Sequence, residues 1–241
     1  MSSSPTAGTE RLGPLVHRSV HHGAILLLLG ALEFIVGMII TQIGYGSSYS
    51  LTGNYISDLG ATKCGVFHGA TSLVGHYACS PWHDVFNVSI ILLGILLVLG
   101  AILVRSAFPA RRTRTIGLVL LVISGFGAMG VGFSPENVNI DVHSFSALLA
   151  FACSGLALIV LGVAMFRDTR WDGYRLYSFL SGLVGLVALV LFVAKVYGPL
   201  GVGGMERLIV APVLLWAIVV GLHLVRIPTF APRTIPRPTE T

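Results

Sequence analysis

Six apolar segments, each about 20 residues long, divide this chain and fix the environment in which it can fold. A helix needs about 20 mostly apolar residues to cross the hydrocarbon core of a bilayer. Hydrophobic residues make up 54% of the chain and charged residues only 10%, more apolar surface than a water-soluble domain can bury. The sequence therefore predicts an all-α, polytopic membrane protein, with six transmembrane helices in one bundle over residues 23–226. The expected spans are 23–43, 84–104, 115–133, 143–166, 176–196 and 208–225, and residues 1–22 and 227–241 are expected to be disordered cytoplasmic tails.

Positive charge is concentrated on one side of these spans. Twelve of the 15 Lys and Arg residues flank the helices on the side of both termini, which the positive-inside rule places in the cytoplasm. The net charge of +5 does not indicate a nucleic-acid partner, because the arginines form short flanks and no basic domain. We expect them to contact anionic lipid head groups. The two groups are Arg11, Arg18, Arg105, Arg111, Arg112, Arg114, Arg167, Arg170, Arg175, Arg226, Arg233 and Arg237, against Lys63, Lys195 and Arg207.

The connection between the first two spans is unusually long. Residues 44–83 form an external loop of about forty residues, which is too long for a simple connector. The loop is moderately apolar, so we expect it to fold as a cap on the bundle, with a short helix near Gly69–Tyr77.

Two cysteines lie in this loop. In an oxidising compartment the natural interpretation is a disulfide, which would stabilise the cap by about 3 kcal/mol on the loop-entropy model. The alternative is a zinc site, since cysteines and histidines occur there at workable spacings. We favour the disulfide between Cys64 and Cys79, and no cofactor, because zinc sites are usually built from tighter paired motifs. The alternative zinc ligands are Cys64, His68, His76, Cys79 and His83.

Polar side chains gather where the helices should end on the external side. They come from the long loop, from the starts of the second, fourth and sixth spans, and from the end of the fifth. In a compact bundle these ends converge, so the sequence predicts one external pocket; helix capping and interfacial solvation are the alternative. The expected ligand-binding residues are Asn54, Asp58, Asn87, Glu136, His143, Lys195, Glu206 and Arg207.

Two features inside the spans have both a functional and a structural interpretation. Glu33 lies near the middle of the first span. Its functional interpretation is a proton or cation relay, and its structural interpretation is a neutral acid that is hydrogen-bonded to a neighbouring helix. The segment Gly125–Gly130 matches the dinucleotide-binding pattern GxGxxG, but it lies within an apolar span and follows no strand. We therefore interpret these glycines as positions of close helix packing.

Several short motifs, taken in order, resemble a known family. They are Asn54-Tyr-Ile-Ser-Asp-Leu-Gly60, Phe86-Asn87 with Gly94, Gly132-Phe-Ser-Pro-Glu136 with His143, and Glu206-Arg207. Over residues 23–226 the chain resembles the bacterial and archaeal membrane family named domain of unknown function 998 (DUF998). That resemblance implies a six-helix bundle of a prokaryotic plasma membrane with unassigned activity. Ile56-Ser-Asp58 followed by Gly60 is more distantly similar to the eukaryotic FRAG/DRAM/SFK group, which implies a connection with lipids.

The sequence favours a protein that binds or handles a lipid or other amphiphile in the outer leaflet. Asp58, His143, Glu206 and Arg207 would then line the polar end of the pocket. An intramembrane hydrolase is the first alternative, in which Ser57 or a metal-bound water attacks and His143 with Asp58 acts as base and orienting group. A small transporter or an accessory subunit of a larger complex is the second. Membrane lipids are the expected partners, and a homo-oligomer or a larger membrane complex stays open.

The charge asymmetry predicts which loops are accessible from outside the cell. In a background without native thiols, single cysteines at Ser47, Asn137 and Gly203 should react with an impermeant reagent added to intact cells. Cysteines at Thr113 and Thr169 serve as controls and should stay unlabelled until the membrane is permeabilised. Labelling of the Thr113 position in intact cells would overturn the predicted orientation.

Overall fold

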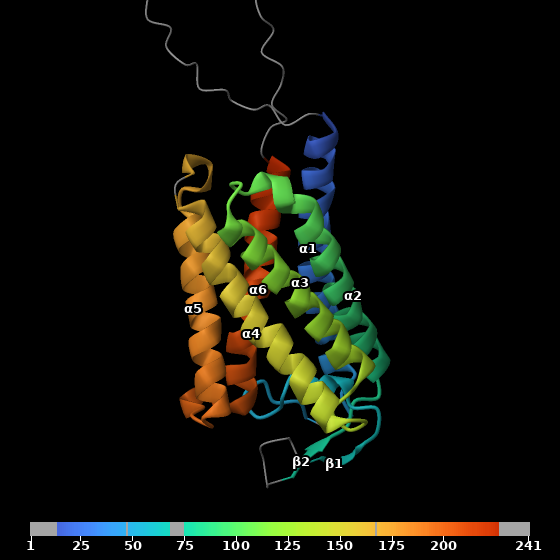
Figure 1. The fold of residues 1–241 in the computed structure, drawn as a ribbon. Helices are drawn as coiled ribbons and strands as arrows, with labels where there is room; N and C mark the ends of the chain where they lie inside the picture. The colour runs from blue at the N-terminus through green and yellow to red at the C-terminus, as the bar shows by residue number, and fades with distance from the viewer. Residues whose placement is uncertain (1–13, 47, 68–74, 167, 227–241) are drawn as a thin grey trace, which may run out of the picture.

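The computed structural model confirms a bundle of six long apolar helices. It describes residues 14–46, 48–67, 75–166 and 168–226 (Figure 1). Within these residues, six helices are long and apolar enough to cross a membrane. The helices are α1 (Pro14–Ile43), α2 (His83–Leu103), α3 (Arg112–Phe133), α4 (Ile140–Met165), α5 (Tyr174–Val193) and α6 (Gly201–Arg226). Short 3-10 turns η1 (Ser57–Gly60), η2 (Val104–Ala107), η3 (Thr169–Trp171) and η4 (Gly198–Leu200) and the strands β1 (Gly65–Phe67) and β2 (His76–Ala78) complete the fold.

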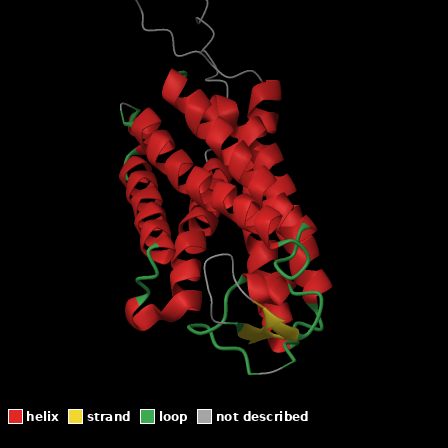
Figure 2. Ribbon diagram, turned by 60° about the horizontal axis from the view of Figure 1, so that its bottom comes forward, coloured by secondary structure: helices red, strands yellow, loops and turns green. Residues whose placement is uncertain are grey.

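The helices run up and down and close into a ring. Each helix packs against the next one in the chain, and α1 also packs against α6 (Figure 1). The long loop and the β1–β2 hairpin cover one end of the ring (Figure 2), which we call the cap end. The opposite end, which we call the basic end, carries Arg105, Arg111, Arg175 and Arg226. The predicted asymmetry of charge is therefore an asymmetry between the two ends of the folded bundle.

Glycines set the close approach of neighbouring helices. A Cβ atom on Gly94 of α2 would lie 2.4 Å from the carbonyl oxygen of Gly125 in α3. A Cβ atom on Gly127 would lie 2.5 Å from the backbone nitrogen of Ala150 in α4. The GxGxxG segment thus lies in helix–helix contacts, which is the role that small residues have in membrane proteins.

Helix α1 begins earlier than the apolar run that predicted it. It starts at Pro14, and Val20 and Ala24 are buried. The Ser19 hydroxyl donates to the carbonyl of Leu103, so the end of α2 supports this extension. Part of the predicted tail 1–22 is therefore helical, and residues 1–13 and 227–241 lie outside the described residues.

The prediction of a short helix near Gly69–Tyr77 is wrong for the residues of this segment that the structure describes. Residues 76–78 form β2, which pairs antiparallel with β1 in the register Val66 opposite Tyr77. A disulfide joins Cys64, just before β1, to Cys79, just after β2. This crosslink holds the two segments side by side, which favours a hairpin over a helix. Residues 68–74 lie outside the described residues.

The tight contact of α2 with α3 predicts a selective effect of added methyl groups. Gly94→Ala should lower the free energy of unfolding by about 1–3 kcal/mol, because its Cβ would meet backbone atoms that cannot move aside. The matched control is Gly185→Ala in α5, where the nearest atom would be 3.5 Å away. There the higher helix propensity of Ala should leave stability unchanged or raise it. Thermal melting in detergent compares the two, and equal effects would contradict this account.

Candidate functional site

A short segment of the long loop is inserted into the cap end of the bundle. We call residues 56–60 the cap plug, and η1 forms most of it. Leu59 and the Asp58 side chain are fully buried. A Cβ on Gly60 would lie 2.5 Å from Asn87 Oδ1, so a larger residue at this position would displace the Asn87 side chain of α2. Buried irregular backbone needs partners for its polar groups, and these partners build the site.

Side chains from three parts of the chain supply those partners. The backbone N–H of Ile56 donates to Glu206 Oε2 of α6. The Ser80 hydroxyl donates to the Leu59 carbonyl at 2.7 Å, and Asn87 Nδ2 of α2 donates to the Gly60 carbonyl at 3.0 Å. Asn87 thus holds the backbone of the plug.

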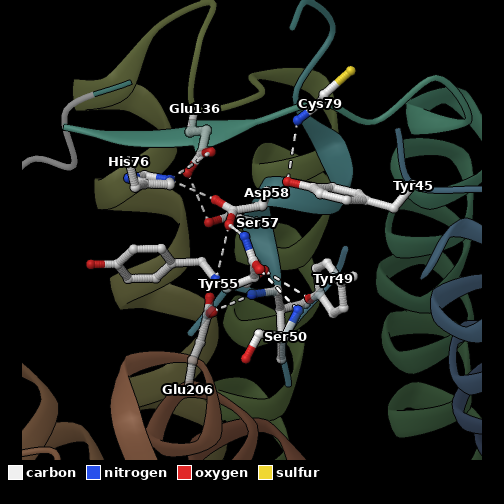
Figure 3. A network of polar contacts seen from close by, with 12 residues as sticks. Tyr45, Tyr49, Ser50, Tyr55, Ser57, Asp58, His76, Cys79, Glu136 and Glu206 are labelled. Atoms are coloured by element: carbon white, nitrogen blue, oxygen red, sulfur yellow. Dashed lines mark hydrogen bonds and ion pairs between the residues drawn. The ribbon is translucent and has the colours of Figure 1, made fainter. Parts of the chain in front are cut away.

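Asp58 is the buried centre of a polar network (Figure 3). Its Oδ2 accepts hydrogen bonds from Asn54 Nδ2 at 2.9 Å and from the Tyr55 backbone N–H at 3.1 Å. Its Oδ1 lies 2.7 Å from His76 Nε2 in β2. Burial raises the pKa of Asp58 above its usual value, and the hydrogen bonds from His76 and Asn54 offset only part of this rise. The hydrogen bond to Asp58, and then the nearby carboxylate of Glu136, raise the pKa of His76 to about 10, so the imidazole is a cation at neutral pH.

Glu136, from the loop between α3 and α4, adds a second carboxylate to this network. Its Oε2 accepts a hydrogen bond from the Ser57 hydroxyl at 2.9 Å. Its Oε1 is buried, lies 3.8 Å from His76 Nε2, and has no hydrogen-bond partner among the described residues. Burial would raise the pKa of Glu136, but the interactions with His76 and Ser57 outweigh it and lower the pKa. Glu136 is therefore an ionised carboxylate with one oxygen left to interact.

Two hollows meet beside this network. The central cavity lies inside the ring and is lined by apolar residues of five helices, among them Phe34, Leu93, Ala128, Ala147 and Leu214. The lateral groove lies between the cap ends of α4 and α5 and is lined by Ile140, Leu148, Leu189, Phe192 and Val193. Both hollows share Ser57, His143, Ala147, Phe151 and Glu206. Two apolar hollows that share polar residues at the cap end match the division of an amphiphile into chain and head.

The remaining predicted site residues lie in different places. Arg207 points to the loop, where its guanidinium donates to the carbonyls of Leu51 at 3.0 Å and Asn54 at 3.1 Å and to the Tyr49 hydroxyl. Its guanidinium fastens the loop to α6 through these hydrogen bonds. Lys195 is exposed just after α5, in a left-handed backbone conformation with φ 60°.

The predicted combination of Ser57, Asp58 and His143 is arranged differently from a nucleophile, orienting group and base. The Ser57 hydroxyl donates to Glu136, and the imidazole next to Asp58 belongs to His76. His143 Nδ1 lies 2.9 Å from the Ser134 carbonyl, and the ring is buried where the two hollows meet.

The cysteines and histidines of the loop are also separated. Cys64 and Cys79 form the disulfide, His83 lies 3.4 Å from Asp84, and His76 faces the carboxylates. His68 lies outside the described residues. His76 is the site residue that sequence reasoning assigned only to the zinc alternative. The expected Cys64–Cys79 disulfide was a usable signal, because it places His76, which shortly precedes Cys79, near the part of the loop that precedes Cys64.

Glu33 lies at the contact of α1 with α2. The Ser89 hydroxyl of α2 donates to Glu33 Oε2 at 2.7 Å. Glu33 Oε1 is buried and has no hydrogen-bond partner among the residues described. This contact is the structural arrangement that the sequence offered as the alternative to a relay.

Comparison with known proteins agrees with the order of the motifs. A family model described as Protein of unknown function (DUF998) matches residues 28–223, which confirms that resemblance. The residues that hold the cap plug, from Asn54 to Arg207, all lie within this range. No curated protein and no solved structure matches the chain. The more distant similarity to the FRAG/DRAM/SFK group stays a prediction.

The buried pair at the centre of the network predicts non-additive mutations. Asp58→Asn and His76→Gln should each lower stability, because each leaves the partner without its counterion. The double variant should lose less than the sum, with a coupling energy of about 1–3 kcal/mol in unfolding measurements in mixed micelles. The control pair is His83→Gln with Asp84→Asn, whose carboxylate side chain is 91% exposed and should couple weakly. Equal coupling in the two pairs would contradict the central role of Asp58.

Proposed function

The chain belongs to the family described as protein of unknown function DUF998, and we propose that it binds an amphiphilic lipid at the cap end of its bundle. The polar head would lie against Glu136, His143 and Glu206, and an acyl chain would occupy the apolar hollows. The observation that carries this proposal is the meeting of the central cavity and the lateral groove at buried polar residues.

The walls of the two hollows support an apolar tail. Apart from residues at the cap end and serines such as Ser124 and Ser154, the central cavity is lined by alkyl and aromatic side chains. The lateral groove continues this surface to the outer ends of α4 and α5, which face lipid in a membrane. A tail could therefore pass from the bilayer into the ring without crossing a polar surface.

The polar end favours a head group that donates hydrogen bonds. Glu136 and Glu206 present acceptors to the hollows, and their burial makes an unsatisfied acceptor costly. Arg207 is already bonded to loop carbonyls and the Tyr49 hydroxyl, so it is poorly placed to hold a phosphate. A primary amine, or a hydroxyl or amide group, fits this end better than an anionic phosphate does.

The charge asymmetry supports a location for this site. If the basic end faces the cytoplasm of a prokaryotic plasma membrane, both termini are cytoplasmic and the cap end meets the outer leaflet. The ligand would then be a lipid of that leaflet, taken up sideways between α4 and α5. Membrane lipids are accordingly the partners that we propose.

Two phospholipids with the same acyl chains test the head-group preference. Phosphatidylethanolamine has a primary amine, whereas phosphatidylcholine has no N–H group to donate. Ligand at about 100 times its Kd stabilises a protein by about 2.7 kcal/mol, or roughly 5–10 °C in Tm for a chain of this size. We expect such a rise with phosphatidylethanolamine in detergent solution and a clearly smaller rise with phosphatidylcholine.

Two variants connect this preference to the site. Glu206→Gln keeps an oxygen for the Ile56 N–H but replaces the other carboxyl oxygen with an amide NH₂, which cannot accept a hydrogen bond from a head group. It should therefore abolish the preference while the protein still folds. Asp84→Asn, also at the cap end but exposed, should keep it. Equal stabilisation of the wild-type protein by both lipids, or a preference unchanged in Glu206→Gln, would overturn the proposal.

A further inference from the structure

We propose that Asp58, His76 and Glu136 form a binding site for a divalent transition-metal ion, and that Zn²⁺ suits these ligands. This site differs from the cysteine-containing set that the sequence offered, with which it shares His76. It goes beyond the proposed lipid binding and does not depend on it.

The geometry gathers one imidazole and two carboxylates around a common point. His76 Nε2 lies 2.7 Å from Asp58 Oδ1 and 3.8 Å from Glu136 Oε1. One ligand atom from each of the three residues lies within 4.8 Å of the others. Zinc binds imidazole nitrogen and carboxylate oxygen at about 2.0–2.2 Å, so small rotations of these side chains would complete a three-ligand set. The ion would replace the proton on His76 Nε2, which is released to solvent when the metal binds.

An unsatisfied oxygen gives an independent indication of a ligand. Glu136 is 9% exposed, and its Oε1 has no hydrogen-bond partner among the described residues, although it faces His76. Its other oxygen is fixed by the Ser57 hydroxyl. A buried acceptor without a partner is rare in native proteins, and a cation at this position would satisfy it.

The surrounding residues orient the ligands as outer-shell groups do in metal proteins. Asn54 Nδ2 and the Tyr55 N–H both bond to Asp58 Oδ2, which leaves Oδ1 facing His76. Ser57 does the same for Glu136. Such outer-shell contacts fix the direction of ligand lone pairs and raise metal affinity.

The site also has an accessible side. His76 and Glu136 line the lateral groove, so an ion held by them would have a coordination position directed to that groove. Three protein ligands with one open position distinguish zinc sites that bind a further ligand from closed structural sites. A water or the head group of a bound molecule could occupy this position.

Metal retention by the full-length protein in lipid-free detergent tests the proposal. The purified protein is stripped with EDTA, equilibrated with Zn²⁺, passed through a desalting column and analysed for metal by mass spectrometry. We expect about one zinc per chain in the wild-type protein and a higher Tm with Zn²⁺ than in EDTA. Glu136→Gln and His76→Gln should each retain less than half of the wild-type zinc content and remove the Tm rise. A cooperative melting transition in EDTA checks that each variant folds. If only one variant folds, that variant alone is enough to test the site.

A second histidine pair supplies the control. His17 and His21 lie on one face of α1 with ring centroids 6.4 Å apart, so they could bind zinc adventitiously. The double variant His17→Gln/His21→Gln should retain the wild-type zinc content. No retained zinc in the wild-type protein, zinc unchanged in Glu136→Gln and His76→Gln, or zinc lost with the His17 and His21 pair would each overturn the proposal. Because no lipid is present, these outcomes are independent of the phospholipid experiment.

Discussion

The structure depends on satisfying the peptide groups of a buried, irregular segment at one end of a membrane-spanning bundle. The cap plug, residues 56–60, closes the ring of helices, and its peptide groups are cut off from water. Each needs a partner within the protein. Glu206, Ser80 and Asn87 provide these partners from different elements. The polar residues at this end are therefore first of all the means by which the plug is held, and the network beside it follows from their position.

The sequence predicted the features that depend on solvent alone. Apolar length specifies the six spans, and the arginines separate the basic end from the cap end, because both patterns report contact with lipid or water. The same reasoning predicted that Asp58, Asn87, Glu136, His143 and Glu206 lie near one another, since they fall in the loops or at the helix ends of one side of the bundle. Hydropathy could not show which acid faces which base. The pairing of His76 with Asp58 depends on how the crosslinked hairpin folds over the plug, and no periodic pattern encodes that contact.

Glu206 and Arg207 show how much one position along a helix decides. Successive helical residues point about 100° apart, so adjacent opposite charges need not share a site. Glu206 lies at the meeting of the two hollows and bonds to the plug from inside. Arg207 lies over the loop and bonds to its carbonyls. The sequence predicted both residues in one pocket, whereas in the structure Glu206 lines the pocket and Arg207 binds the loop.

This separation leaves a site rich in carboxyl groups, and their oxygens argue for the kind of ligand. Three buried carboxyl groups, Asp58, Glu136 and Glu206, lie near His76, whose pKa near 10 makes it a cation. A buried acceptor without a partner is costly, so the site gains from any ligand that brings positive charge or donates hydrogen bonds. An amine-bearing head group would do so at Glu206, and a metal ion would do so at Asp58, His76 and Glu136. These positions adjoin along the lateral groove, so an ion could complete the polar end of a lipid site. A lipid head group could equally reach Glu206 with no ion bound.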